Sequence, residues 1–146
     1  MKPQKIIRHL FAFQLLLALS MFTANTRAEV VVIVSAKSHV TSLTAQQTAK
    51  IFLGKTSEFP DDSDALPIDQ AIGNGIRDEF YAKVVHKNPS QVSAYWAKII
   101  FAGDGRPPEI LDGDIAVRRA VAKNPNAIGY IDKKSVNRTV RVILEP

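Results

Sequence analysis

Runs of hydrophobic residues separated by polar segments give the first indication of structure. Residues Val30–Val34 are all valine or isoleucine, and side chains branched at Cβ favour a strand over a helix. Because every position in this run is apolar, the strand is expected to be covered on both faces of a sheet. Other runs rich in apolar residues predict three further strands, at Leu66–Asp69, Ala127–Ile131 and Thr139–Leu144.

Four segments between these strands have apolar residues at helical spacing. The first begins at Thr44, where Gln47 three residues later completes a capping-box pattern. It ends at Gly54, a residue typical of the position after a helix. The other three follow the turn Gly73–Gly75, begin at Asn88–Pro89, and cover Asp112–Lys123.

The apolar faces of the last two helices indicate which residues should be buried. We expect Val92, Trp96 and Ile100 to face the core from the third helix, and Ile115 and Val117 from the fourth. Strands separated by helices predict an α/β fold with three layers, α/β/α. Residues 29–146 are enough for a single domain with one hydrophobic core.

The N-terminal residues have the pattern of a secretory signal peptide. Three basic residues precede the apolar run Leu10–Phe22, and a short polar stretch then leads to Ala28. We therefore predict a signal peptide at residues 1–28, cleavage before Glu29 and a periplasmic location. The alternative is a membrane anchor that stays attached, although the apolar run is shorter than the roughly 20 residues that span a bilayer.

The charge of the chain lies mostly in its predicted signal peptide. The whole sequence has 19 lysines and arginines against 14 acidic residues, a net charge of +5. Four of the basic residues and none of the acidic ones precede Glu29, so the mature domain is close to neutral. This argues against nucleic acid as a partner, which needs a lasting basic field. The absence of cysteine excludes disulfides, thiolate metal sites and lipid attachment.

Residues that could support catalysis or metal binding are sparse. His39 and His86 have no partner at metal-ligand spacing. The acidic loop Asp61–Asp64 lacks the glycine and distal glutamate of a calcium-binding loop. Neither a nucleophile–base pattern nor a P-loop is present. We therefore predict no catalytic residue, no metal and no cofactor, and hence a protein that is not an enzyme.

One turn has the composition of an anion-binding site. The predicted strand Leu66–Asp69 runs into Gly73-Asn74-Gly75-Ile76-Arg77, where a helix begins. A helix N-terminus presents free N–H groups, glycines allow close approach, and Arg77 can pair with an oxyanion. The alternative is a plain turn in which Asn74 caps the helix and Arg77 lies on the surface.

Three motifs resemble those of the phosphate-type substrate-binding proteins of ABC transporters. Residues Leu43–Lys55 follow the family pattern Leu-Thr-x-x-Gln-x-x-x-Ile-Phe-x-Gly-Lys. Residues Gln70–Arg77, with Phe80 after them, stand where the family has Arg-x-x-x-Ser-Gly-Thr and an aromatic residue. Residues Asn126–Ile131 are similar to the family strand Gly-Ala-Ile-Gly-Tyr.

The resemblance implies that the domain corresponds to one lobe, the second, of a two-lobed periplasmic binding protein. It implies phosphate or another oxyanion as the ligand and the membrane subunits of an ABC transporter as partners. The implied ligand-binding residues are Gln70, Gly73, Asn74, Gly75, Ile76 and Arg77. Gly75 matches the family motif, whereas Gln70 replaces its arginine, Asn74 its serine and Ile76 its threonine.

These departures leave a second function open. The lobe would then be an interaction module that has lost tight ligand binding and contacts another envelope protein. Such a module should expose an apolar patch. Tyr95, Trp96 and Phe101 are candidates for it, although Trp96 is expected in the core. A homodimer would restore a two-sided cleft.

Overall fold

The computed structural model describes residues 28–146. The predicted signal peptide lies outside the described residues, except for Ala28. Among the described residues, no helix combines the length and the hydropathy needed to cross a membrane.

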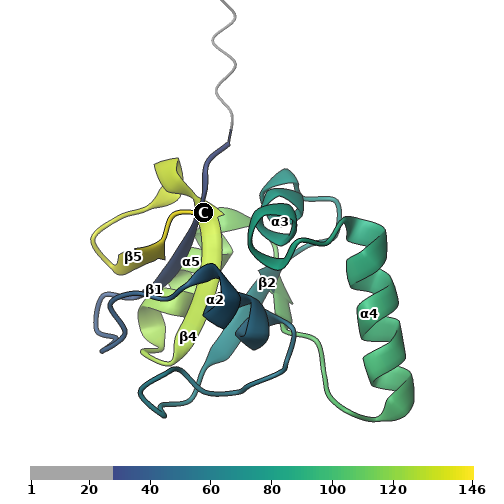
Figure 1. The fold of residues 1–146 in the computed structure, drawn as a ribbon. Helices are drawn as coiled ribbons and strands as arrows, with labels where there is room; N and C mark the ends of the chain where they lie inside the picture. Colours follow the sequence, from purple (N-terminus) through teal and green to yellow (C-terminus); the bar gives the residue numbers. More distant parts are fainter. Residues whose placement is uncertain (1–27) are drawn as a thin grey trace, which may run out of the picture.

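A mixed sheet of five strands forms the centre of the molecule (Figure 1). Its strand order is β3-β2-β4-β1-β5. Strand β2 runs parallel to β3 and β4, whereas β1 is antiparallel to both β4 and β5. The strands are β1 (Val30–Ser35), β2 (Leu66–Gln70), β3 (Glu109–Leu111), β4 (Ala127–Asp132) and β5 (Val140–Leu144).

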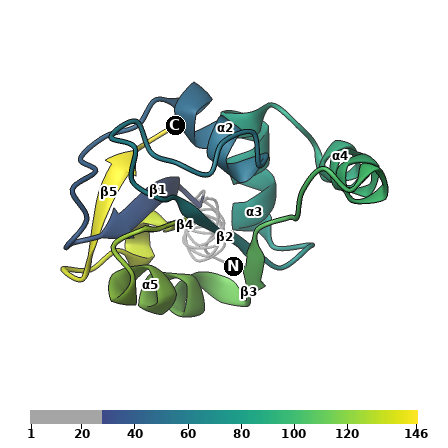
Figure 2. The same ribbon diagram turned by 90° about the horizontal axis from the view of Figure 1, so that it is seen from below.

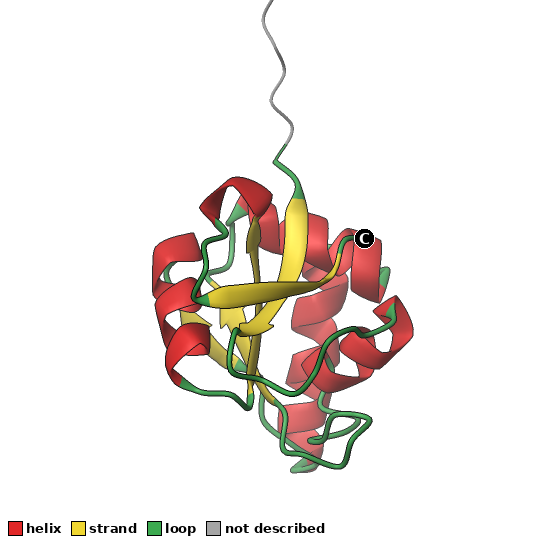
Figure 3. Cartoon of the chain, turned by 90° about the vertical axis from the view of Figure 1, so that its left-hand side faces the viewer, coloured by secondary structure: helices red, strands yellow, loops and turns green. Residues whose placement is uncertain are grey.

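Helices cover both faces of this sheet, as the sequence predicts. Helix α5 lies on one side and α2 and α3 lie on the other, so the sheet is sandwiched between helical layers (Figures 2 and 3). The helical segments are α2 (Ala45–Phe52), α3 (Gly75–Phe80), the π-helical segment η2 (Tyr81–Val85), α4 (Pro89–Ala102), α5 (Gly113–Lys123) and the 3₁₀ turn η3 (Lys133–Ser135). The predicted three-layer α/β/α fold is therefore confirmed.

The alternation of side chains along β1 explains its unbroken apolar sequence. Successive residues of a strand point to opposite faces. Val30, Val32 and Val34 pack into the core beneath α2 and α3, whereas Val31 and Ile33 pack against α5. Both faces are buried, so the strand has no position where a polar side chain would meet water.

An aromatic stack holds α2 and α3 on the sheet. The rings of Phe80 and Tyr130 are stacked with centroids 4.0 Å apart and an interplanar angle of 4°. Phe52 tilts against Phe80 at a centroid distance of 4.6 Å. These three residues come from α2, α3 and β4, and each belongs to one of the three motifs identified in the sequence. The stack therefore fixes the ends of α2 and α3 against β4, the central strand of the sheet.

The predicted helix caps are present. The Thr44 hydroxyl accepts the Gln47 N–H, and the Gln47 side chain accepts the Thr44 N–H. Asn88 and Gln91 form the same reciprocal pair at the start of α4. These local sequence signals place both helix starts correctly.

Two expectations about buried residues are wrong. Ile100 on α4 is 56% exposed and Ile115 on α5 is 55% exposed. Helix α4 stands away from the sheet (Figures 1 and 2), and it is held mainly by Val92 and Trp96, its buried residues. Strand β3 was not expected, because its three residues follow a proline-rich loop and lie at the sheet edge.

Candidate functional site

The predicted anion-binding turn lies at the carboxyl end of β2, between that strand and α3. Strands β2 and β4 are parallel neighbours, and ligands of α/β proteins commonly bind beyond the carboxyl ends of such strands. Gly73 has a φ of +87°, a conformation that suits glycine. A Cβ added at Gly73 or Gly75 would meet no atom within 4 Å. The space above the turn is therefore open.

The side chains of Gln70 and Asn74 are bonded within the protein. Asn74 caps α3, because its Oδ1 accepts the Ile76 N–H at 2.9 Å. Its Nδ2 donates to Gln70 Oε1, also at 2.9 Å. Gln70 Nε2 in turn donates to Asp114 Oδ1 and to the carbonyl oxygen of Tyr130, both at 2.9 Å. These two amides thus fix the turn against α5 and β4.

Arg77 is buried, so the interpretation that placed it on the surface is wrong. The residue is only 5% exposed. Its Nε lies 3.4 Å from Asp69 Oδ1, and its guanidinium carbon lies 4.8 Å from the centroid of the Tyr81 ring. The Nε is buried without a hydrogen-bond partner. Within residues 28–146, the guanidinium is held by an ion pair and a ring face rather than by hydrogen bonds.

Asp69 is the centre of a buried polar cluster beneath the turn. It is 2% exposed and accepts hydrogen bonds from the Tyr81 hydroxyl at 2.9 Å, from the Tyr130 hydroxyl and from the Gln70 N–H. Burial, together with the Asp69 charge, raises the pKa of both tyrosines well above the usual range. Both hydroxyls therefore remain protonated donors, and the Asp69 charge is balanced by Arg77.

Backbone donors complete the candidate site. The N–H groups of Gly75 and Arg77 have no acceptor within the part of the chain that the structure describes, whereas the Ile76 N–H is taken by Asn74. The cluster contains no serine, cysteine or histidine placed as a nucleophile or base. The turn thus combines free backbone amides and open space at Gly73 and Gly75 with the Arg77 guanidinium, which is buried against Asp69.

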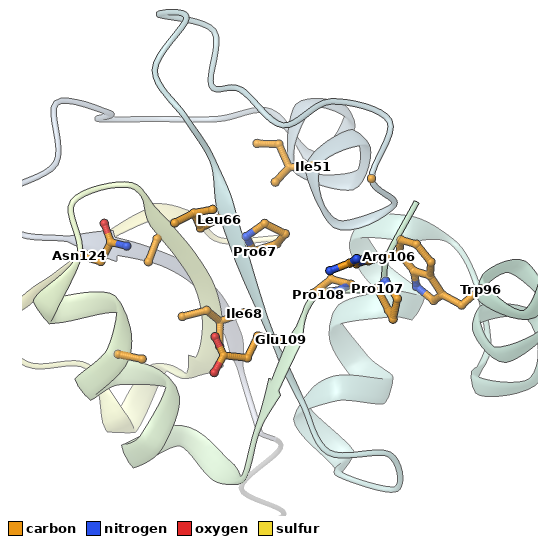
Figure 4. A pocket seen from close by; sticks show the side chains of 13 residues that line it. Ile51, Leu66, Pro67, Ile68, Trp96, Arg106, Pro107, Pro108, Glu109 and Asn124 are labelled. Carbon is orange, nitrogen blue, oxygen red and sulfur yellow. The ribbon is translucent and has the colours of Figure 1, made fainter. Parts of the chain in front are cut away.

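A separate cavity of about 400 Å³ lies at the opposite end of β2, and it contains none of the predicted site residues. Leu66, Pro67 and Ile68 form one side, and Trp96 faces them across the gap beside Pro107 and Pro108 (Figure 4). Arg106 and Glu109 are the charged residues of its lining. Sequence reasoning missed this cavity, because it depends on where α4 and the start of β3 are placed. The paired prolines at 107–108 were its only local signal.

No family model matches the chain, and no curated protein matches its sequence. Solved structures match its fold. One, from Clostridium perfringens, is described as a phosphate ABC transporter substrate-binding protein with bound phosphate. It has a TM-score of 0.63 and 25% sequence identity, and the match covers 80% of this chain and 44% of that one.

Two further solved structures share the fold at lower identity. An ABC-type phosphate transport receptor from Vibrio cholerae has a TM-score of 0.63 and 18% identity, covering 80% of this chain and 45% of its own. PstS from Borrelia burgdorferi has a TM-score of 0.52 and 16% identity, with coverage of 80% and 46%. The chain spans less than half the length of the structures it matches. It thus has the α/β fold of one lobe of a periplasmic binding protein and resembles phosphate ABC transporter substrate-binding proteins.

Proposed function

We propose that this chain is an exported, periplasmic binding protein that captures phosphate or another oxyanion at the turn Gly73–Arg77. The fold supports the class of protein, because the solved structures that it resembles are binding proteins for phosphate transport. The location of the site is inferred from the contacts and burial of this chain's own residues.

The burial of Arg77 is the observation that carries the proposal. A guanidinium has five N–H donors, and the Nε donor of Arg77 is buried without a hydrogen-bond partner within residues 28–146, in a residue that is only 5% exposed. Leaving buried donors unsatisfied is costly. An oxyanion would supply acceptors in the planar arrangement that arginine fits best.

The turn adds uncharged donors to this cation. We propose that the free N–H groups of Gly75 and Arg77 meet the anion, and that Gly73 and Gly75 let it approach the backbone. Gln70 and Asn74 position the turn from behind, since their own amides are bonded inside the protein. Ile76 contributes a buried side chain that holds the start of α3 in the core.

Asp69 sets an upper limit on the strength of capture. Its carboxylate lies 3.4 Å from Arg77, so the pair together carries no net charge. A charge-assisted hydrogen bond contributes about 1.5–3 kcal/mol, and here part of that interaction is already made with Asp69. We therefore expect phosphate affinity weaker than that of a site whose arginine is unpaired.

Delivery of the bound anion to ABC transporter membrane subunits is part of the same proposal.

Calorimetric titration with phosphate tests the proposal. The protein, purified from the periplasm of an expressing cell, should give saturable heat with phosphate, and sulfate serves as the comparison anion. Arg77→Gln removes the charge and shortens the side chain but keeps it polar, and it should abolish the heat while circular dichroism shows an intact fold. An absence of heat up to millimolar phosphate, or unchanged binding by Arg77→Gln, contradicts the site. Sequencing of the purified N-terminus should return Glu29 if the signal peptide is cleaved there.

A second candidate function is favoured by the surface of α4. Phe101 is 96% exposed and Ile100 is 56% exposed, which supports an interaction module for another envelope protein or a second copy of this chain. Of the other residues predicted for this patch, Trp96 is buried, and the Tyr95 hydroxyl donates to the Leu53 carbonyl at 2.6 Å. A photo-crosslinking residue at position 101 should capture one defined partner in intact cells, whereas the same residue at the exposed Arg119 of α5 should not.

A further inference from the structure

A second recess lies between α2 and η2, away from the turn Gly73–Arg77. These two elements pack against each other, and the recess between them has a volume of about 530 Å³. Its lining combines apolar and basic side chains and contains no acidic residue. The lining residues are Ala45, Gln46, Ala49, Lys50, Leu53, Lys55, Val84, Val85, His86 and Lys87.

The shape of the recess follows from small residues and an unusual helix end. Ala45 and Ala49 are one turn apart on α2, so the same face of that helix lacks large side chains there. Opposite them, η2 ends at His86, whose φ of +57° is left-handed. A side chain other than glycine rarely adopts this conformation. It turns the chain so that His86 and Lys87 stand at the rim.

The charge of this rim is uncompensated. Lys50, Lys55, His86 and Lys87 form no ion pair with any of the described residues. Elsewhere in the described chain, Lys83 is paired with Glu79 at 2.8 Å, and Lys133 lies between two glutamates. The C-terminal ends of helices attract cations, which accounts for individual lysines. It does not account for four basic residues around one apolar recess in a domain that is close to neutral.

We propose that this recess binds an acidic, amphipathic segment of a partner protein. An apolar side chain of that segment would enter beside Ala49 and Val85, and its carboxylates would face Lys50, Lys55 and Lys87. Helix-in-groove recognition commonly combines such anchors with charge complementarity. The proposal is independent of the oxyanion site, which involves none of these residues.

The low exposure of the apolar lining argues against a membrane surface. Leu53, Val84 and Val85 are 7%, 2% and 8% exposed, so none of them protrudes from the recess. A surface that binds membranes needs apolar side chains that protrude. Free phosphate is also a poor match, because the floor offers no donor and the rim cations are solvated.

Nuclear magnetic resonance titration of the ¹⁵N-labelled full mature protein tests this inference. The probe is the peptide acetyl-Glu-Leu-Leu-Glu-Glu-Leu-Leu-Glu-amide, and its matched control replaces every glutamate by glutamine. We expect saturable shifts confined to the end of α2 and to residues 84–87, with little effect from the control peptide. Raising the salt concentration should weaken binding, because the rim charges are exposed.

Two kinds of variant separate charge from shape. The double variant Lys50→Glu/Lys87→Glu should weaken binding of the probe about tenfold or more, since two attractive contacts become repulsive. Lys98→Glu on α4 makes a similar change outside the recess and should leave binding unchanged. Ala49→Leu fills the recess without altering charge and should also reduce binding.

Several outcomes would overturn the inference. Shifts centred on α4, equal binding of the glutamine peptide, or no effect of the double variant would each place recognition elsewhere. Binding to phosphatidylglycerol vesicles without binding of the peptide would identify a membrane surface instead. Phosphate titration of the double variant should match that of the unmodified protein, which keeps this test separate from that of the oxyanion site.

Discussion

Replacing Gly129 by alanine places a methyl group in the contact between β4 and α5. A Cβ at this position would lie 2.7 Å from Val117 Cγ1 and 3.1 Å from Val121 Cγ2. Both valines are fully buried, so neither has free space into which to rotate. Overpacking of this kind costs about 1–3 kcal/mol. That exceeds the roughly 0.5–1 kcal/mol by which alanine is favoured over glycine in a strand, and we therefore expect Gly129→Ala to be destabilising.

The shift should also reach the candidate site. Helix α5 carries Asp114, which accepts hydrogen bonds from the Gln70 side chain, the Asp132 N–H and the Ser135 hydroxyl. If α5 moves outward to admit the methyl group, Asp114 moves with it and the support of Gln70 loosens. Gly129→Ala should therefore weaken any phosphate binding as well as stability.

Denaturant unfolding monitored by circular dichroism measures the effect on stability. We expect a lower midpoint with an unchanged dependence on denaturant. Val117→Ala removes the atom that clashes most, so the double variant should be more stable than the sum of the single changes by about 1 kcal/mol or more. The reasoning fails if Gly129→Ala is as stable as the unmodified protein, or if the two changes add within about 0.5 kcal/mol.

Three further predictions concern the polar cluster, the turn and α4. Burial and the Asp69 charge raise the pKa of Tyr81 and Tyr130 above the ordinary 10.0. The unfolded chain therefore loses these protons first, and stability should fall above pH 10 by up to about 1.4 kcal/mol per pH unit for each tyrosine. Tyr130→Phe should make that fall shallower, and a flat profile of unfolding free energy against pH would contradict the assignment. Asn74→Ala should lower the unfolding free energy by about 1 kcal/mol through loss of the cap, and Asn74→Ser should recover part of it in the same assay. Phe101→Ser should change the unfolding free energy by less than about 0.5 kcal/mol. It should nevertheless abolish self-association, measured by sedimentation, or capture of a partner at α4, measured by crosslinking.

Local sequence signals predicted much of the fold because the relevant interactions are short in range. The capping pairs Thr44–Gln47 and Asn88–Gln91 join residues three apart, so composition alone reveals them. The β-branched run at 30–34 identified a strand buried on both faces. The exposure of Ile100 and Ile115 was not predictable in the same way. Helical spacing defines an apolar face, but it does not determine how closely that face approaches the sheet.

The same distinction between local and long-range contacts applies to the candidate site. The turn Gly73–Gly75 and the cap at Asn74 were evident in the sequence, because both depend on neighbouring residues. The burial of Arg77 was not, since it depends on the ion pair with Asp69, whose carboxylate is in turn bonded to Tyr130, 61 residues further along the chain. The internal bonding of Gln70 likewise requires Asp114. These contacts follow from the strand order β2-β4-β1, which pattern alone does not give.

The position of β1 has a consequence for folding. This strand is the first of the described chain, yet both of its partners, β4 and β5, belong to the last twenty residues. Pairings between segments so far apart in sequence form late and slowly. A nascent chain that has not yet emerged beyond β4 therefore cannot close the centre of its sheet. For a protein proposed to cross a membrane in an unfolded state, this order of pairing delays the native sheet until β4 and β5 have also crossed.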